Sequence, residues 1–137
     1  MPESVWRTDR DPLYRLDDRT PAMIFEEGLK PWDAADGQYD LKKYVAKNQP
    51  SPFVSTTYDR TLYQRWNKDY VYEIDAPGGI KVNATIGQHK FFDQNEVAFP
   101  GGLDRRFIVG AREVESDGIT LGPLIENPAL QTLVEKK

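Results

Sequence analysis

Four polar side chains spread along the chain could together break a glycosidic bond: Arg15, Ser55, Gln94 and Glu96. A carboxylate beside a developing positive charge stabilises an oxocarbenium-like transition state more than the ground state. Arginine suits a phosphate or ribose because its planar guanidinium donates in pairs and is always charged. Taken alone, Glu96 is better explained as an ordinary residue on the surface of a strand, and Arg15 as the salt-bridge partner of Asp17 or Asp18.

The spacing within the chain suggests how these groups meet. Gln94 and Glu96 are two residues apart on a predicted strand, so alternation of side chains places an amide and a carboxylate on one face. Ser55 could fix the carboxylate rotamer by a hydrogen bond. Trp66 and the pair Phe91-Phe92 could stack on a flat ligand or fill the core, and adjacent aromatics on an extended segment point to opposite sides.

Composition excludes several other chemistries. The 137 residues contain no cysteine and a single histidine, His89, which argues against disulfides, thiol nucleophiles, a zinc hydrolase and a Ser-His-Asp enzyme. A net charge of −4 argues against broad binding to nucleic acid, although Arg60, Arg65 and Lys68 lie close together, as do Arg105 and Arg106. We expect no membrane span and no signal peptide.

The elements that must position these residues alternate irregularly. After an arm at 1–12, the patterns predict several short strands, short helices and two Pro-Gly-Gly turns, which is typical of an α+β fold. No Gly-x-Gly-x-x-Gly follows a strand, which excludes a Rossmann site. The predicted strands are 13–16, 53–57, 70–75, 96–99, 107–114 and 119–121; the predicted helices are 22–27 (capped by Thr20 and Pro21), one from Asp40, 59–66 and one from 128; the turns are 77–79 and 100–102.

The order of these pieces resembles the mono-ADP-ribosyltransferase toxins of the Arg/Ser-Thr-Thr/Gln-x-Glu class, and within them the pierisin-like branch that contains scabin and ScARP. The resemblance covers about residues 13–110. It rests on Leu13-Tyr14-Arg15-x-Asp17-x-Arg19, Asp36-Gly37-Gln38-Tyr39-Asp40, Asn48-Gln49-Pro50-Ser51-Pro52-x-Val54-Ser55-Thr56-Thr57-Tyr58-Asp59, Ile74-Asp75-Ala76-Pro77-Gly78-Gly79, Thr85-Ile86-Gly87 and Asp93-Gln94-x-Glu96-Val97-Ala98-Phe99-Pro100-Gly101-Gly102.

The resemblance implies a fold and a set of roles. The fold is two packed antiparallel or mixed β-sheets with flanking short helices and an NAD⁺ cleft between them. Glu96, Gln94, Arg15 and Ser55 are implied as catalytic residues, and NAD⁺ as cosubstrate without a metal. The implied NAD⁺-binding set is Arg15, Asp17, Arg19, Asn48, Ser55, Thr56, Trp66, Gln94 and Glu96; the implied acceptor-binding set is Gln94, Phe91, Lys68 and Trp66.

The expected function is a toxin domain at 13–137 that transfers ADP-ribose to guanine in DNA or nucleotides, or to RNA, with residues 114–137 outside the resemblance. A protein-arginine ADP-ribosyltransferase or an NAD⁺ glycohydrolase is the alternative within enzymes. A catalytically silent module that binds a nucleotide or a protein is the alternative outside them. Phe91 stands where scabin-like enzymes have a Trp, which leaves the acceptor open. We expect a monomer that acts in the target-cell cytoplasm after secretion or injection, with a possible immunity protein as partner.

Overall fold

The described part of the chain is built on one mostly antiparallel β-sheet. A computed structural model describes residues 3–31, 52–87 and 92–130. Within them the strands follow the order β4-β5-β2-β1-β3-β6-β7, and every neighbouring pair is antiparallel. The bounds are β1 Leu13–Asp17, β2 Phe53–Thr57, β3 Tyr70–Ile74, β4 Ile80–Lys81, β5 Glu96–Pro100, β6 Ile108–Glu113 and β7 Ile125–Glu126.

Short helices flank the sheet. The helix α1, Pro21–Glu27, begins as predicted: Thr20 is its N-cap, its side chain accepts from the amide of Met23, and Pro21 opens the helix. A second short helix is α3, Val82–Ile86, and the 3₁₀ turns are η1 Leu62–Arg65, η2 Phe92–Gln94 and η3 Arg105–Phe107. The helix predicted at 59–66 is therefore the shorter turn η1, and the one predicted from Asp40 lies outside the described residues. No helix in the described ranges is both long and apolar enough to span a bilayer.

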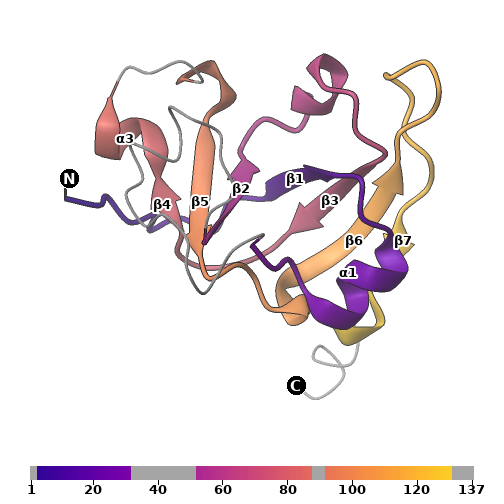
Figure 1. Cartoon of the computed structure of the whole chain (residues 1–137), viewed down its shortest axis with the longest axis horizontal. Helices are drawn as coiled ribbons and strands as arrows, with labels where there is room; N and C mark the ends of the chain where they lie inside the picture. The colour runs from indigo at the N-terminus through magenta and orange to yellow at the C-terminus, as the bar shows by residue number, and fades with distance from the viewer. Residues whose placement is uncertain (1–2, 32–51, 88–91, 131–137) are drawn as a thin grey trace.

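The sheet consists of two groups of strands joined at a narrow point. The strands β4, β5 and β2 lie on one side of Figure 1, and β1, β3, β6 and β7 on the other. Between β1 and β2 the only register pair is Tyr14 with Thr57, whereas β1 pairs with β3 along its whole length. The α+β class is confirmed. The two sheets expected from the sequence are these two groups, linked by a single pairing into one open sheet.

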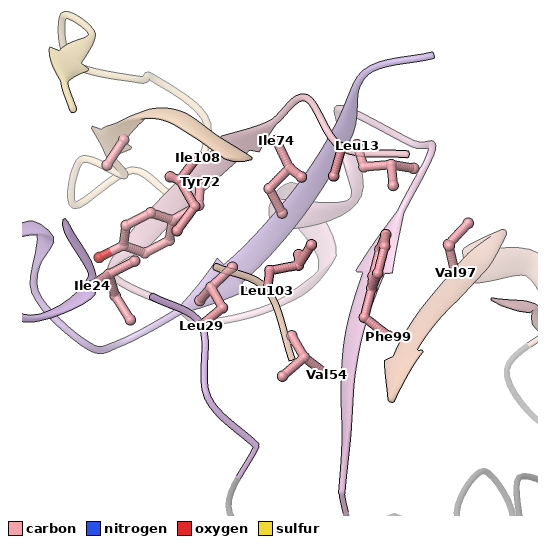
Figure 2. Packing of buried hydrophobic residues seen from close by; sticks show 12 residues of the cluster. Leu13, Ile24, Leu29, Val54, Tyr72, Ile74, Val97, Phe99, Leu103 and Ile108 are labelled. Atoms are coloured by element: carbon pink, nitrogen blue, oxygen red, sulfur yellow. The ribbon is translucent and has the colours of Figure 1, made fainter. Parts of the chain in front are cut away.

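The main hydrophobic cluster draws on both groups of strands. Figure 2 shows Tyr72 and Ile108 from β3 and β6 together with Val54 and Phe99 from β2 and β5. Leu13, Tyr72 and Ile108 are completely buried. Because burial of each large apolar side chain is worth about 1.5–3 kcal/mol, this cluster fixes the angle between the groups and so holds the ends of β1, β2 and β5 together.

The N-terminal arm is docked along the edge of the sheet. Trp6 bridges to Ile80, and the amide of Lys81 donates to the carbonyl of Val5 at 2.9 Å. The buried guanidinium of Arg7 donates to the carbonyls of Ala76, Gly78 and Asp11 at 2.6–3.0 Å. A buried arginine with this many acceptors stabilises the segment that holds it, so residues 3–12 cover the edge of β4 that would otherwise be open.

The C-terminal segment, which lies beyond the motifs, is also part of the sheet. The last strand is β7 at Ile125–Glu126, not 119–121, where only Leu121 forms an isolated bridge, with Val114. The contacts of Asn127 explain why the last strand lies at residues 125–126. Its side chain is 1% exposed and donates to the carbonyls of Arg105 and Ile108 at 2.7 and 2.8 Å, which fixes the chain beside β6.

Replacing Asn127 should destabilise the fold. Asn127→Ala removes two hydrogen bonds, of which the one to the carbonyl of Ile108 is buried, and this costs about 1–3 kcal/mol. Glu126→Ala is the matched control, because Glu126 is the adjacent residue, exposed at the end of β7, and should change stability by less than about 0.5 kcal/mol. Urea unfolding of the two variants measures the difference, and equal midpoints would contradict the anchoring role of Asn127.

Candidate active site

Glu96 is a buried carboxyl at the start of a strand. It is the first residue of β5, lies opposite Thr57 of β2 and is 7% exposed. Ser55 and Thr57 share a face of β2, so Ser55 lies diagonally across from Glu96. The Oε2 atom of Glu96 is buried and has no hydrogen-bond partner among the described residues. A buried acceptor left unpaired is costly unless a ligand supplies the donor.

The surroundings of Glu96 change its ionisation. Burial raises the pKa of Glu96 from 4.5 to about 7, against the hydrogen bond from Ser55 and the positive charge of Arg15, which both lower it. The carboxyl is therefore close to half-protonated at neutral pH. A ligand that brings a hydroxyl donor or a positive charge to Oε2 would favour the ionised form, so binding of such a ligand and ionisation reinforce each other.

Arg15 links β1 to the strand that carries Ser55. Its Nη1 donates to the carbonyl of Ser55 at 3.0 Å, and its Nε donates to Asp17 at 3.1 Å. The side chain is 22% exposed, and its Nη2 has no partner among the described residues. The structure thus brings Arg15, Ser55 and Glu96 together, and within the described ranges one guanidinium nitrogen of Arg15 is left without a partner.

Asp17 is saturated by arginine donors. One oxygen accepts from the backbone amide and Nε of Arg19, at 2.9 and 3.0 Å, and the other from Nη2 of Arg19 and Nε of Arg15, at 2.7 and 3.1 Å. Burial alone would raise the pKa of Asp17, but the hydrogen bonds from Arg19 and the charge of Arg15 outweigh it and hold the pKa below 3.8. Asp17 orients two arginines, of which Arg19 is 25% exposed, and its predicted contact with the cosubstrate stays a prediction.

Thr56 does not join this group. It is 2% exposed, and its hydroxyl donates to the carbonyl of Val97 at 2.8 Å, on the opposite face of β2 from Ser55. The neighbouring Thr57, which was not among the predicted site residues, contacts the segment that carries Gln94. Its hydroxyl donates to the carbonyl of Gln94 and accepts from the amide of Asp59 at 2.9 Å. Only the pairing of β2 with β5 makes that contact visible.

The segment that carries Gln94 and Glu96 is not a continuous strand, and the expected alternation is wrong here. Gln94 ends the 3₁₀ turn η2, Asn95 has φ +47°, and Glu96 opens β5. A left-handed residue between the two side chains interrupts the extended backbone on which alternation depends. Gln94 is consequently half-buried, with no partner for its amide among the described residues, while Glu96 is buried.

The predicted acceptor residues lie partly on an exposed loop after η1. Trp66 is 43% exposed, and Lys68 lies 3.6 Å from Asp18 in an exposed ion pair. Arg65, which was noted only for its charge, joins this loop to η2 by an ion pair with Asp93 at 2.7 Å. Asn48, His89 and Phe91 lie outside the described residues, so their predicted positions remain predictions.

This arrangement suits cleavage of a bond to an electron-poor sugar carbon. A carboxyl that can ionise on ligand binding, an arginine with a spare donor and a partly exposed amide border one region. Among residues 3–31, 52–87 and 92–130, no three His, Cys, Asp or Glu side chains are placed to hold a metal ion.

Comparison with known proteins identifies relatives by sequence. The model of a family described as Scabin-like matches residues 13–130. The guanine-specific ADP-ribosyl transferase of Streptomyces coelicolor is 57% identical over 116 residues, which cover 83% of this chain and 57% of that protein. Pierisin of Pieris brassicae is 37% identical over 137 residues, which cover 83% of this chain and 15% of pierisin. The chain therefore spans less than two thirds of both curated relatives.

Solved structures show the same fold. A variant of the scabin toxin of Streptomyces scabies has a TM-score of 0.90 and 51% identity, covering 93% of this chain and 80% of that one. Scabin in complex with NADH has a TM-score of 0.89 and 52% identity, covering 92% of this chain and 79% of that one. These matches extend past residue 110, so the C-terminal segment belongs to the shared fold.

Proposed function

This chain belongs to the Scabin-like family, as its sequence motifs predicted, and from that membership we propose that it is an NAD⁺-dependent mono-ADP-ribosyltransferase acting on guanine. The observation that carries the proposal is the unpaired, buried Oε2 of Glu96 beside Ser55 and Arg15. NAD⁺ offers what this carboxyl lacks, a ribose hydroxyl donor and a positively charged nicotinamide. The relative solved with NADH supports the choice of a nicotinamide dinucleotide.

In the proposed reaction the bond between nicotinamide and ribose breaks, and nicotinamide leaves with the bonding pair. Ionised Glu96 accepts a hydrogen bond from the ribose hydroxyl and stabilises the positive charge that develops on the sugar. Arg15, held by Asp17 and by the carbonyl of Ser55, offers its Nη2 to the dinucleotide phosphate or ribose. The guanine amino nitrogen bonds to the sugar carbon and loses a proton to water.

We propose guanine, free or in nucleic acid, as the acceptor. The S. coelicolor relative is named guanine-specific, and this chain shares 57% identity with it. Exposed Trp66 offers a flat surface for a base, and Lys68 a charge for a phosphate. The amide of Gln94 has no partner among residues 3–31, 52–87 and 92–130, and its place close to Glu96 in the chain suits it to orient the incoming nitrogen.

Gln94→Ala should separate the two half-reactions. We expect transfer to guanosine to fall at least about tenfold more than hydrolysis of NAD⁺ by water, because the amide serves the acceptor and not the bond that breaks. Gln64→Ala is a control on an exposed glutamine of η1. Parallel assays of nicotinamide release and of labelled guanosine measure both steps, and an equal loss of the two would remove Gln94 from acceptor selection.

The experiment that tests the function is transfer of label from NAD⁺ to guanosine, GTP, DNA, RNA and protein, with Glu96→Ala alongside. Label on a guanine-containing fraction that is absent with the variant is the expected result. Label on protein arginine would indicate a protein-arginine ADP-ribosyltransferase. Release of nicotinamide without any labelled acceptor would indicate an NAD⁺ glycohydrolase. Binding of NAD⁺ without turnover would indicate a silent binding module.

The domain boundaries, the partner and the place of action are also proposals. We propose that residues 13–137 form one catalytic domain that works in the cytoplasm of a target cell and is neutralised in its producer by an immunity protein. The name of scabin as a toxin supports action in a target cell. The chain has no cysteine, so the fold needs no disulfide in the cytoplasm. Toxicity of the wild type but not of Glu96→Ala, when each is expressed in a host cytoplasm, tests it.

A further inference from the structure

The backbone of Asn95, between the two proposed catalytic side chains, has an unusual conformation. Its φ is +47°, and it is the only residue other than glycine with positive φ among the described residues. Its side chain is exposed, so packing does not select the residue type. Asparagine, aspartate and glycine enter this left-handed region readily, whereas alanine pays a cost and a β-branched residue pays more.

The left-handed residue is held on both sides by strand β2. Thr57 donates its hydroxyl to the carbonyl of Gln94, and the amide of Tyr58 donates to the carbonyl of Asn95 at 3.3 Å. Glu96 is fixed separately, because it pairs with Thr57 in the β2–β5 ladder. A change of conformation at residue 95 would therefore rotate the peptide that carries Gln94 and leave Glu96 in its ladder.

We propose that Asn95 is a positioning residue that sets the partition between transfer of ADP-ribose and its loss to water. This inference rests on the proposed function and deepens it. With φ positive, Gln94 stands half-buried at the end of η2 while Glu96 stays buried at the start of β5. With an extended residue 95, the alternation of a strand would turn the amide of Gln94 out of the position that it has at the end of η2.

A substitution series at residue 95 tests the proposal. Asn95→Gly and Asn95→Asp should keep the ratio of guanosine transfer to NAD⁺ hydrolysis within about twofold of the wild type. Asn95→Val should lower that ratio about tenfold, with Asn95→Ala between them and NAD⁺ hydrolysis reduced far less. Glu115→Val, at an exposed position with ordinary φ, is the control for placing valine on the surface.

Thermal unfolding of the same variants supplies a readout that needs no activity. Midpoints near the wild type for Gly and Asp, and lowest for Val, are expected from the left-handed backbone alone. A folded Asn95→Val enzyme with an unchanged ratio would overturn the proposal, and so would an Asn95→Gly enzyme that loses transfer as Val does. If the wild type itself modifies no guanosine, the proposed function fails, while equal midpoints across the series would refute the conformation of Asn95.

Discussion

Glu96→Gln is expected to lower NAD⁺ turnover by about 10²–10³-fold or more and, at the same time, to stabilise the folded chain above pH 7. The loss of turnover follows because an amide of the same shape cannot carry the negative charge that opposes the developing cation. The gain in stability follows because the wild type must keep an ionised carboxylate in a site where it is 7% exposed.

The sign of the pH dependence follows from the raised pKa. Burial raises the pKa of Glu96 from 4.5 to about 7, so between these pH values the folded chain keeps a proton that the unfolded chain has released. The free energy of unfolding of the wild type should therefore fall as pH rises through this window, by about 3 kcal/mol in total, and then level off. Glu96→Gln should not show that fall.

Urea unfolding of both proteins at pH 5 and pH 8 measures the effect. The difference in stability should be large at pH 8 and close to zero at pH 5. Glu113→Gln is the matched control, an exposed glutamate on β6 with β2, β1 and β3 between it and β5. A variant that is less stable than the wild type at pH 8 would show that the charge on Glu96 stabilises the fold, contrary to our account.

The same pKa predicts how activity depends on pH. If ionised Glu96 is the active form, kcat/KM for NAD⁺ should rise about tenfold per pH unit up to about pH 7 and then become constant. The pH at which the plateau begins reports the pKa of Glu96 in the free enzyme, because kcat/KM depends on the ionisation of groups in the free enzyme. A profile that is flat between pH 5 and 7 would contradict the burial-driven shift.

Asp17→Asn is expected to destabilise the fold by about 3–5 kcal/mol and to raise the KM for NAD⁺. The variant leaves Arg15 and Arg19, both largely buried, without the carboxylate that holds them. The two guanidiniums would repel each other, and Arg15 would lose the contact that fixes its Nε. Because Arg15 acts on substrate binding in our proposal, the defect should appear in KM more than in kcat.

Asp18→Asn is the control for this prediction. Asp18 is the next residue, but it is exposed and its ion pair with Lys68 spans 3.6 Å, so the cost should stay below about 1 kcal/mol. The pKa of Asp17 is lowered, so its stabilising charge is complete above pH 3.8 and disappears as pH falls through the lower folded value. Acid unfolding of the wild type should be steeper than that of Asp17→Asn; equal slopes would exclude Asp17 as the cause.

Local features of the sequence determined most of the elements. Thr20 and Pro21 predicted where α1 begins, β-branched residues predicted β2, and the Pro-Gly-Gly turns predicted the breaks before β4 and after β5, where Gly78, Gly79, Gly101 and Gly102 all have positive φ. These signals act through near neighbours and so are readable without the fold. The order of Arg15, Ser55, Gln94 and Glu96 predicted the family, because each motif is short and all of its residues are present.

Only the tertiary structure decided how those residues are used. The pairing of β2 with β5 buries Glu96, leaves its Oε2 unpaired and raises its pKa to about 7. Contacts across the chain turn Thr56 into the sheet, and Asn95 breaks the strand that alternation had predicted. Burial and hydrogen bonding depend on partners dozens of residues away, as with Thr57 and Gln94. The sequence specifies which side chains are present. Their distances from one another and their exposure to solvent are determined only when the strands have paired.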